Sequence, residues 1–294
     1  MAAEWQGKSR GTVLGYKIFV FCIRKLGLNA AYFVLLFVAF YFCFFAWSST
    51  KSIYYYFRKR LKYSWLKSII SIYKSYFVFG QTIIDKIAIA AGLKDKFTYT
   101  IDGEELIRAV LAGQKGGVLI SAHLGNFEIA QQFFGELEEK PVISLLTTDS
   151  EHTAIRDYLE SVTKKANINP IYIQEDLSHI FEINSALSRN EIVCITGDRY
   201  INGSKYLEQE LLGETAKFPA GPFHLASRLK VPVLYVYVMR QKNKHYYLYA
   251  TTTKATYRDA QGLLATYTKN LEFMLDKFPL QWFNYFDFWG KLGK

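Results

Sequence analysis

The residues best suited to chemistry are His123 and Glu128, in the run His123-Leu124-Gly125-Asn126-Phe127-Glu128 that follows the apolar segment GGVLISA. Histidine titrates near neutral pH, so it can take up and return a proton during a reaction. A carboxylate that contacts one ring nitrogen fixes the tautomer and leaves the other nitrogen as a general base. A continuous helix would hold two residues at this spacing far apart around its axis, whereas a turn between a strand and a helix brings them together. The pattern therefore predicts an acid–base pair at such a turn.

The turn itself has suitable residues. Gly125 permits a sharp reversal of the chain, and Asn126 is expected to cap the helix that follows. By itself the pattern also fits a hydrogen-bonded loop histidine and a glutamate that is stabilised at a helix N-terminus. The other histidines, His152, His179, His224 and His245, are expected to be structural or solvated.

The pair must be positioned by an α/β domain, because short apolar runs alternate with helical patterns from residue 95 onward. The predicted strands are Phe97–Ile101, Gly117–Ala122, Pro141–Thr147, Pro170–Gln174, Ile192–Thr196, Val231–Met239 and Lys244–Thr253, the last two forming a hairpin. The predicted helices are one capped by Asp102 with Glu105, then Asn126–Glu139, Glu151–Asn167, Asp176–Arg189, Pro222–Leu229 and Arg258–Phe278. We expect a mostly parallel sheet that is covered by helices, with functional residues at the carboxyl ends of its strands.

Composition places a membrane-associated segment before this domain. The chain has 294 residues, of which 50% are hydrophobic and 17% aromatic, so it is not a disordered protein. Its net charge of +10 belongs to residues 1–75, which hold twelve basic residues and one acid, while the rest of the chain carries −1. Three widely spaced cysteines, Cys22, Cys43 and Cys194, indicate a reducing compartment and exclude a disulfide framework.

The main apolar run lies within that basic segment. Twenty-five residues without a charge separate Lys25 from Lys51, and as a helix they would reach about 37 Å, enough to cross a hydrocarbon core of about 30 Å. Membrane insertion is the prediction, with a buried core helix as the alternative. Because basic residues flank both ends, the positive-inside rule does not orient the helix, and a helix that enters and leaves on one face fits as well.

Residues 51–92 mix aromatic residues with lysines and arginines, which is typical of basic amphipathic helices that lie on an anionic membrane surface. A solvated basic face is the alternative, and nucleic-acid binding is disfavoured beside a membrane helix. We therefore divide the chain into a membrane-anchoring part, 1–92, and a catalytic α/β domain, 93–294.

Four ordered segments carry a resemblance to a known family. They are AHLGNFE around His123, Gly197-Asp198-Arg199, Leu211–Val238 and the tail PLQWFNYFDFW (Pro279–Trp289). Together with the N-terminal apolar helix they resemble the bacterial lipid A biosynthesis late acyltransferases of the lysophospholipid acyltransferase superfamily. The resemblance spans nearly the whole chain.

The resemblance implies transfer of a fatty acyl group from a thioester, on acyl carrier protein or coenzyme A, to a hydroxyl or amine of a lipid. His123 would be the general base and Glu128 its orienting partner. Asn126, Asp198, Arg199 and Gly221 would bind substrate, and backbone amides near Gly221 and Arg199 are candidate oxyanion donors. No cofactor is expected besides the acyl thioester co-substrate, and no metal. The expected partners are the acyl donor, a lipid acceptor and an anionic membrane, at the cytoplasmic face of a bacterial inner membrane.

The acceptor stays open at this point. A lipid A precursor is the commonest acceptor in the family, but this chain has Asp198-Arg199-Tyr200 where many members have an Asp-x-Asp stretch, and its tail contains no arginine. An amino-acid lipid or a polyene-type pigment is the alternative acceptor. Two other classes are a membrane scaffold without activity and a thioesterase or lipase, although no G-x-S-x-G nucleophile motif is present.

Overall fold

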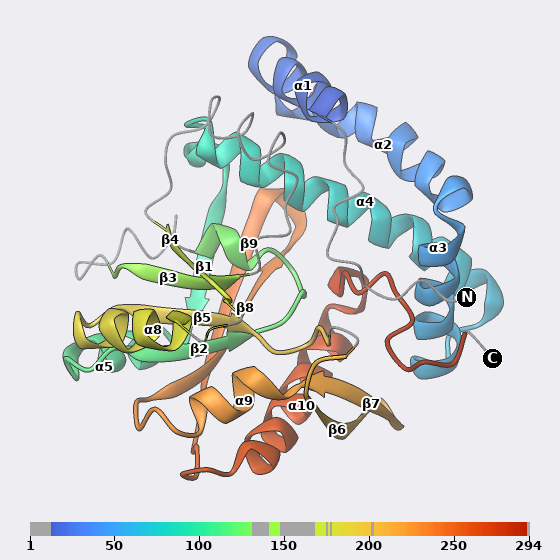
Figure 1. The fold of residues 1–294 in the computed structure, drawn as a ribbon. Helices are drawn as coiled ribbons and strands as arrows, with labels where there is room; N and C mark the ends of the chain where they lie inside the picture. The colour runs from blue at the N-terminus through green and yellow to red at the C-terminus, as the bar shows by residue number, and fades with distance from the viewer. Residues whose placement is uncertain are drawn as a thin grey trace.

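A computed structural model describes residues 13–130, 141–147, 168–174, 176, 178–200 and 203–292. A long helical segment precedes the sheet, and further helices follow individual strands (Figure 1). The α-helices of the described residues are α1 (Val13–Phe21), α2 (Leu28–Phe45), α3 (Trp47–Tyr55), α4 (Trp65–Ala90), α5 (Glu104–Ala112), α8 (Ser178–Ser188), α9 (Ala220–Ala226) and α10 (Ala260–Lys277). Short π or 3₁₀ turns are η1 (Cys22–Leu26), η2 (Tyr56–Arg60), η3 (Lys94–Lys96), η4 (Phe127–Ile129), η5 (Lys242–Lys244) and η6 (Pro279–Gln281).

The centre of the domain is a seven-stranded sheet with the order β1-β9-β8-β2-β5-β3-β4. All neighbouring strands in it are parallel except the hairpin pair β8 and β9. The strands are β1 (Thr98–Asp102), β2 (Gly117–Ser121), β3 (Ile143–Thr147), β4 (Ile168–Tyr172), β5 (Ile192–Thr196), β8 (Val233–Arg240) and β9 (His245–Thr253), and a separate hairpin consists of β6 (Tyr206–Leu211) and β7 (Glu214–Pro219). The predicted mostly parallel sheet is therefore confirmed, and so is the hairpin near the C-terminus.

Some local predictions are wrong. Asp102 does not cap a helix, because it ends β1 and accepts a hydrogen bond from Tyr247 Oη (2.5 Å), while Gly103 occupies the capping position of α5. The stretch 51–92, predicted to be helical, consists of the end of α3, then η2 and α4, with a break between η2 and α4. The predicted helix Glu151–Asn167 lies outside the described residues, as does most of Asn126–Glu139.

Two clusters of buried apolar side chains make up the core. Both draw on the central strands, since successive residues of β2 alternate between them: Val118 and Ile120 belong to one cluster and Leu119 to the other. The second cluster also contains Ile84 and Ile87 of α4. Buried contacts therefore continue across residue 92, where we predicted the boundary between anchor and catalytic domain.

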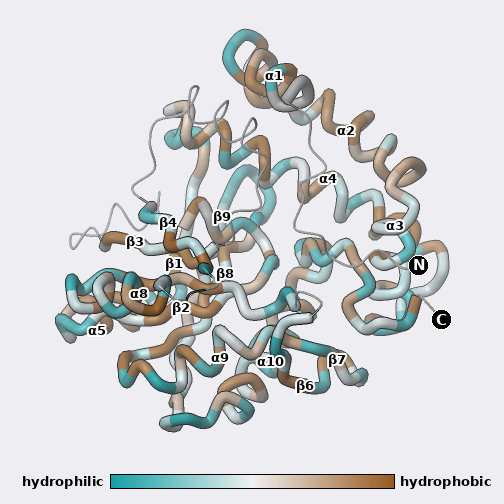
Figure 2. The backbone as a smooth tube through the Cα atoms, in the orientation of Figure 1, coloured by the Kyte–Doolittle hydropathy of each residue, from teal (hydrophilic) through white to brown (hydrophobic). Residues whose placement is uncertain are grey.

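The N-terminal helices lie along one side of this domain. Helix α4 runs beside the sheet, and α2 follows α4 on the side away from the strands (Figure 1). Among the described residues, α2 is the helix long and apolar enough to cross a membrane by length and composition, and 22% of its residues are buried. Figure 2 shows its hydrophobic character continuing along most of the helix.

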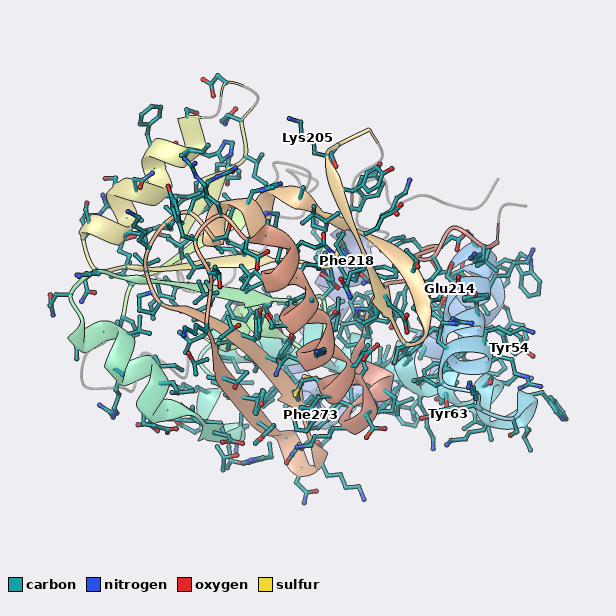
Figure 3. All side chains as sticks on the ribbon, turned by 90° about the horizontal axis from the view of Figure 1, so that it is seen from below. Tyr54, Tyr63, Lys205, Glu214, Phe218 and Phe273 are labelled. Atoms are coloured by element: carbon teal, nitrogen blue, oxygen red, sulfur yellow. The ribbon has the colours of Figure 1, made fainter. Side chains whose placement is uncertain are left out.

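The β6–β7 hairpin was not predicted. Its two-residue turn has positive φ at Leu212 (53°) and Gly213 (75°), which is the conformation of tight hairpin turns. The tip reaches the α3–η2 segment, where Arg60 Nη1 pairs with Glu214 Oε2 at 3.2 Å. Figure 3 shows Glu214 at this end of the hairpin and Lys205 at the other.

Candidate active site

The candidate site begins where the central strand β2 ends. All five residues of β2 are buried, and the chain then turns so that His123 stands two residues beyond the strand. Gly125 makes the turn possible, because its φ is +73° and a Cβ atom there would lie 2.1 Å from the carbonyl oxygen of Val238. The next amide, Asn126 N, donates to that same carbonyl at 2.8 Å. The predicted sharp turn is thus confirmed, and it is held against β8.

Asp198 follows the neighbouring strand β5 and lies directly against His123. Its Oδ1 is 2.7 Å from His123 Nδ1, and its Oδ2 accepts a hydrogen bond of 3.0 Å from the His123 backbone amide. The Asp198 side chain is fully buried, whereas 29% of the His123 side chain is exposed. An ionised carboxylate only accepts hydrogen bonds, so this contact keeps the proton of a neutral imidazole on Nδ1. Among the described residues, no hydrogen bond involves His123 Nε2.

The C-terminal tail completes the surroundings of Asp198. Trp282 Nε1 (3.1 Å) and Asn284 Nδ2 (2.8 Å) both donate to Asp198 Oδ2. The Phe283 amide between them donates to the carbonyl oxygen of His123 at 2.8 Å. Arg199 holds the tail from the other side, because its Nε donates to Asn284 Oδ1 and its Nη2 to the Phe283 carbonyl, each at 3.1 Å. The tail thus fixes both members of the His123–Asp198 pair.

The charges of these groups follow from burial and from each other. Burial and the positive charge of Arg199 lower the pKa of His123 below its usual 6.5, against the opposing effect of Asp198. Burial tends to raise the pKa of Asp198, but its interactions with His123 and Arg199 outweigh this and hold it at about 2. Burial lowers the pKa of Arg199 to about 10, against the effect of Asp198. At neutral pH the site therefore combines a neutral imidazole, a carboxylate and a guanidinium.

The structure brings together only some of the predicted site residues. His123, Asp198 and Arg199 come together as described. Asn126 is buried, and its side chain donates to the Thr82 carbonyl at 2.8 Å, which holds the turn against α4. It occupies the predicted N-cap position, at η4, but its side chain makes no capping hydrogen bond there. Gly221 is exposed at the start of α9, and no described contact joins it to His123 or Asp198.

The backbone of Glu128 lies in the short turn η4, five residues after His123. Its side chain, and with it the predicted contact to His123, lies outside the described residues. The position next to His123 Nδ1 is taken by Asp198, which we had predicted to bind substrate.

Sequence reasoning missed the roles of Gln281, Trp282 and Asn284. Gln281 donates from Nε2 to the Arg240 carbonyl and accepts at Oε1 from the Arg240 amide, while its own carbonyl accepts from Gly125 N. These residues belong to a largely aromatic tail, about 160 residues away from His123. The resemblance to the family singled out this tail, but sequence spacing could not assign its partners.

Metal binding finds no support in the described part of the chain, which has no group of three or more His, Cys, Asp or Glu side chains that could hold an ion. The three cysteines, Cys22, Cys43 and Cys194, are free thiols. The chemistry that the described site can perform is proton transfer through His123.

Comparison with known families identifies the family of the chain. The family model described as bacterial lipid A biosynthesis acyltransferase matches residues 67–289, which include β2, β5 and the tail. No curated protein matches the chain. The match covers three quarters of the sequence and begins within α4, two residues after that helix starts. The chain therefore belongs to the bacterial lipid A biosynthesis acyltransferase family and is an acyltransferase.

Proposed function

We propose that the protein transfers a fatty acyl group from an acyl thioester to a hydroxyl or amine of a membrane lipid, with His123 as general base. The observation that carries the proposal is the 2.7 Å contact between His123 Nδ1 and the buried Asp198 carboxylate. This contact orients the imidazole and commits Nδ1, so that Nε2 is the nitrogen available for proton transfer on a side chain that is partly exposed.

The proposed step needs no covalent acyl-enzyme. His123 Nε2 removes the proton from the acceptor hydroxyl or amine as that atom attacks the thioester carbonyl carbon. The C–S bond of the resulting tetrahedral intermediate then breaks, and the departing thiolate takes the proton from the imidazolium. Asp198 stabilises the positive charge that His123 carries between these two transfers. The lowered pKa of His123 keeps it neutral, and hence basic, in the resting enzyme.

Two carboxylates are proposed to assist His123. Asp198 is the orienting group because its oxygen faces Nδ1, and Glu128 is retained as the second carboxylate of the predicted pair. Substitution separates them. If Asp198 orients His123, Asp198→Asn changes kcat far more than KM and lowers kcat more than Glu128→Gln does. If Glu128 is the orienting group, Glu128→Gln causes the larger loss of kcat. Glu105→Gln, at an exposed position of α5, is the control for loss of a carboxylate elsewhere.

The substrates we propose are an acyl carrier protein thioester as donor and a lipid A precursor as acceptor, at the cytoplasmic face of a bacterial inner membrane. The family match supports a lipid acceptor, and the basic N-terminal segment suits both anionic lipid and an acidic carrier. Backbone amides near Gly221 and Arg199 remain our candidates for stabilising the oxyanion. An amino-acid lipid or a polyene-type pigment is the second candidate acceptor, since Asp198-Arg199-Tyr200 departs from the Asp-x-Asp stretch.

The test incubates detergent-purified protein with acyl carrier protein thioesters, with and without a bacterial lipid extract. We expect an acylated lipid only when lipid is present, and its loss in His123→Ala but not in the control His245→Ala, which removes a histidine at the start of β9. Thioester hydrolysis without lipid would indicate a thioesterase instead. Undiminished transfer by His123→Ala would refute the mechanism.

The acceptor is identified separately. Deleting the gene and comparing whole-lipid mass spectra should show one lipid class that lacks one acyl chain. A change in lipid A supports the first acceptor, and a change confined to amino-acid lipids or pigments supports the second.

A further inference from the structure

The helix α2 has one face that is buried from Leu28 to Ala39. Its buried residues recur every three or four positions, which places them on a single stripe: Leu28, Ala31, Leu35 and Ala39, continued by Ala46 just after the helix. Ala31 and Ala39 are at most 1% exposed, and such small side chains allow close approach to the neighbouring helix. The first three residues of the stripe belong to one core cluster of the domain, and the last two belong to the other.

Polar and aromatic contacts hold both ends of α2 against α4. Near its start, Tyr32 Oη donates to the carboxylate of Asp85, which is fully buried. Near its end, the ring of Phe42 lies 6.1 Å from that of Tyr76, whose hydroxyl is 3.1 Å from Thr50 Oγ1 at the start of α3. The two helices therefore run antiparallel in contact, and α4 in turn lies on the catalytic domain (Figure 1).

The opposite face of α2 is an exposed aromatic surface. Six of its side chains are between 53% and 72% exposed: Phe33, Phe37, Phe40, Tyr41, Phe44 and Phe45. They form pairs one turn apart, such as Tyr41 and Phe45, whose rings stack at 4.4 Å. Exposed Leu66, Ile69 and Ile70 of α4 extend the surface, since they lie on the same helical face as Tyr73, which reaches α2. An apolar surface of this extent is typical of membrane contact.

Geometry decides how this surface meets the bilayer. As folded, α2 has 18 residues, which span about 27 Å, slightly less than a hydrocarbon core of about 30 Å. It also carries α4 along its length, with the buried ion pair of Asp85 and Arg240 beneath it. A helix perpendicular to the membrane would draw these charges and the adjoining strands into the hydrocarbon, which is strongly unfavourable.

The basic residues at the two ends of α2 suit contact with one membrane surface. Arg24 and Lys25 precede α2, and Lys51 follows it, while no charged residue lies between them. If α2 crossed the bilayer, one of these basic groups would face the opposite leaflet. If α2 lies flat, the basic residues at both of its ends reach the anionic headgroups of the same leaflet. The aromatic side chains then enter the boundary between headgroups and acyl chains.

We propose that α2 is not a transmembrane helix but lies in the plane of one leaflet of an anionic membrane, through its aromatic face. The catalytic domain and both ends of α2 are then on the same side of the membrane. The proposal concerns topology and is independent of which acyl acceptor the enzyme uses.

The test labels single cysteines with a membrane-impermeant maleimide in a Cys43→Ala background, since the other two native cysteines are buried. Leu26→Cys and Lys51→Cys report the two ends of α2, and Phe181→Cys, on the exposed face of α8, reports the side of the catalytic domain. All three should react in inverted inner-membrane vesicles and be protected in spheroplasts. Labelling of Leu26→Cys from the side opposite to Phe181→Cys would overturn the proposal.

A second measurement reports depth on the purified protein in vesicles of phosphatidylethanolamine and phosphatidylglycerol. Fluorophores on cysteines at positions 33, 37, 40 and 44 should be quenched equally by spin-labelled lipids. A spanning helix would give depths that differ by about 16 Å between the first and last of these positions. Such a gradient, or no quenching at all because protein covers the face, would also contradict the proposal. Both measurements are interpretable whether or not the enzyme acts on lipid A.

Discussion

The described part of the chain contains two fully buried aspartates, Asp198 at the candidate active site and Asp85 in α4, and their surroundings differ in one respect. Asp85 has a direct cationic partner, since Arg240 Nε lies 2.7 Å from its Oδ2, and the hydroxyls of Tyr246 and Tyr32 complete its shell. The hydrogen bonds to Asp198 come instead from an imidazole, a backbone amide, an indole and a carboxamide. The nearby Arg199 donates to the tail.

On the proposed mechanism, the difference separates a structural group from a functional one. The charge of Asp85 is compensated by a guanidinium that is only 9% exposed, so the cluster is closed and ties α2, α4 and the sheet together. The charge of Asp198 acts on His123, whose side chain retains 29% exposure. A buried carboxylate next to an accessible imidazole can stabilise the imidazolium during a reaction, whereas a closed ion pair has no such role. The two sites are joined through Gln281, which binds both Arg240 and Gly125.

The largest difference should appear in activity. Asp198→Asn replaces the acceptor at His123 Nδ1 by an amide, so we expect kcat to fall by roughly 10²- to 10⁴-fold, because the imidazole loses its orientation and the stabilisation of its charged form. Asp85→Asn should change kcat little in the fraction of protein that is folded. Single-turnover rates with a saturating acyl thioester make the comparison. Equal losses in the two variants would remove the distinction between the clusters.

The free energy of unfolding should depend more strongly on the Asp85 cluster than on the Asp198 cluster. Asp85→Leu leaves Arg240 buried without its anionic partner, and we expect a loss of about 3–5 kcal/mol in the free energy of unfolding. The double variant Asp85→Leu/Arg240→Met removes both charges and should recover most of that loss. Denaturant unfolding in detergent, followed by tryptophan fluorescence, measures both. A double variant as unstable as the single one would contradict the interpretation of a compensated pair.

The pH dependence tests the charges around His123. Because His123 must be neutral to accept a proton and its pKa is lowered, kcat/KM should fall on the acidic side with an apparent pKa below 6.5. Arg199→Gln removes a positive charge that depresses this pKa, so the acidic limb should move to higher pH. Arg199→Lys keeps the charge and should leave the limb near its original position. A limb that stays in place in Arg199→Gln would mean that His123 does not titrate in the activity profile.

The sequence predicted the parts of the fold that are encoded locally. The apolar run of β2, Gly125 and His123 are consecutive, so a strand, a turn and a histidine at its tip could be inferred from their order. The β6–β7 hairpin had a signal that we did not use, which is Gly213 followed by alternating polar and apolar residues at 215–218. Its turn needs a positive φ at Leu212, and leucine is not a residue type from which a positive φ would be predicted.

Partners that lie far apart in the sequence could not be predicted. We expected Glu128, whose side chain lies outside the described residues, to face His123 because it is close in the chain. The oxygen beside Nδ1 belongs to Asp198, 75 residues away and just beyond the adjacent strand β5. The same limit applies to the pair formed by Asp85 and Arg240. In the sequence, α4 shows a basic amphipathic pattern, and nothing near Asp85 indicates that a strand 155 residues later neutralises it.

The smallest expected effect concerns two tryptophans of the tail. Trp282 Nε1 donates to Asp198, whereas Trp289 Nε1 is buried without a hydrogen-bond partner among the described residues. Trp282→Phe should therefore cost about 1–3 kcal/mol in the free energy of unfolding and less than tenfold in kcat, since three other donors still hold the carboxylate. Trp289→Phe removes an indole of similar burial but no hydrogen bond, so its cost should be limited to lost packing. If the loss of kcat is the same in both variants, the indole of Trp282 acts through aromatic packing of the tail rather than through Asp198.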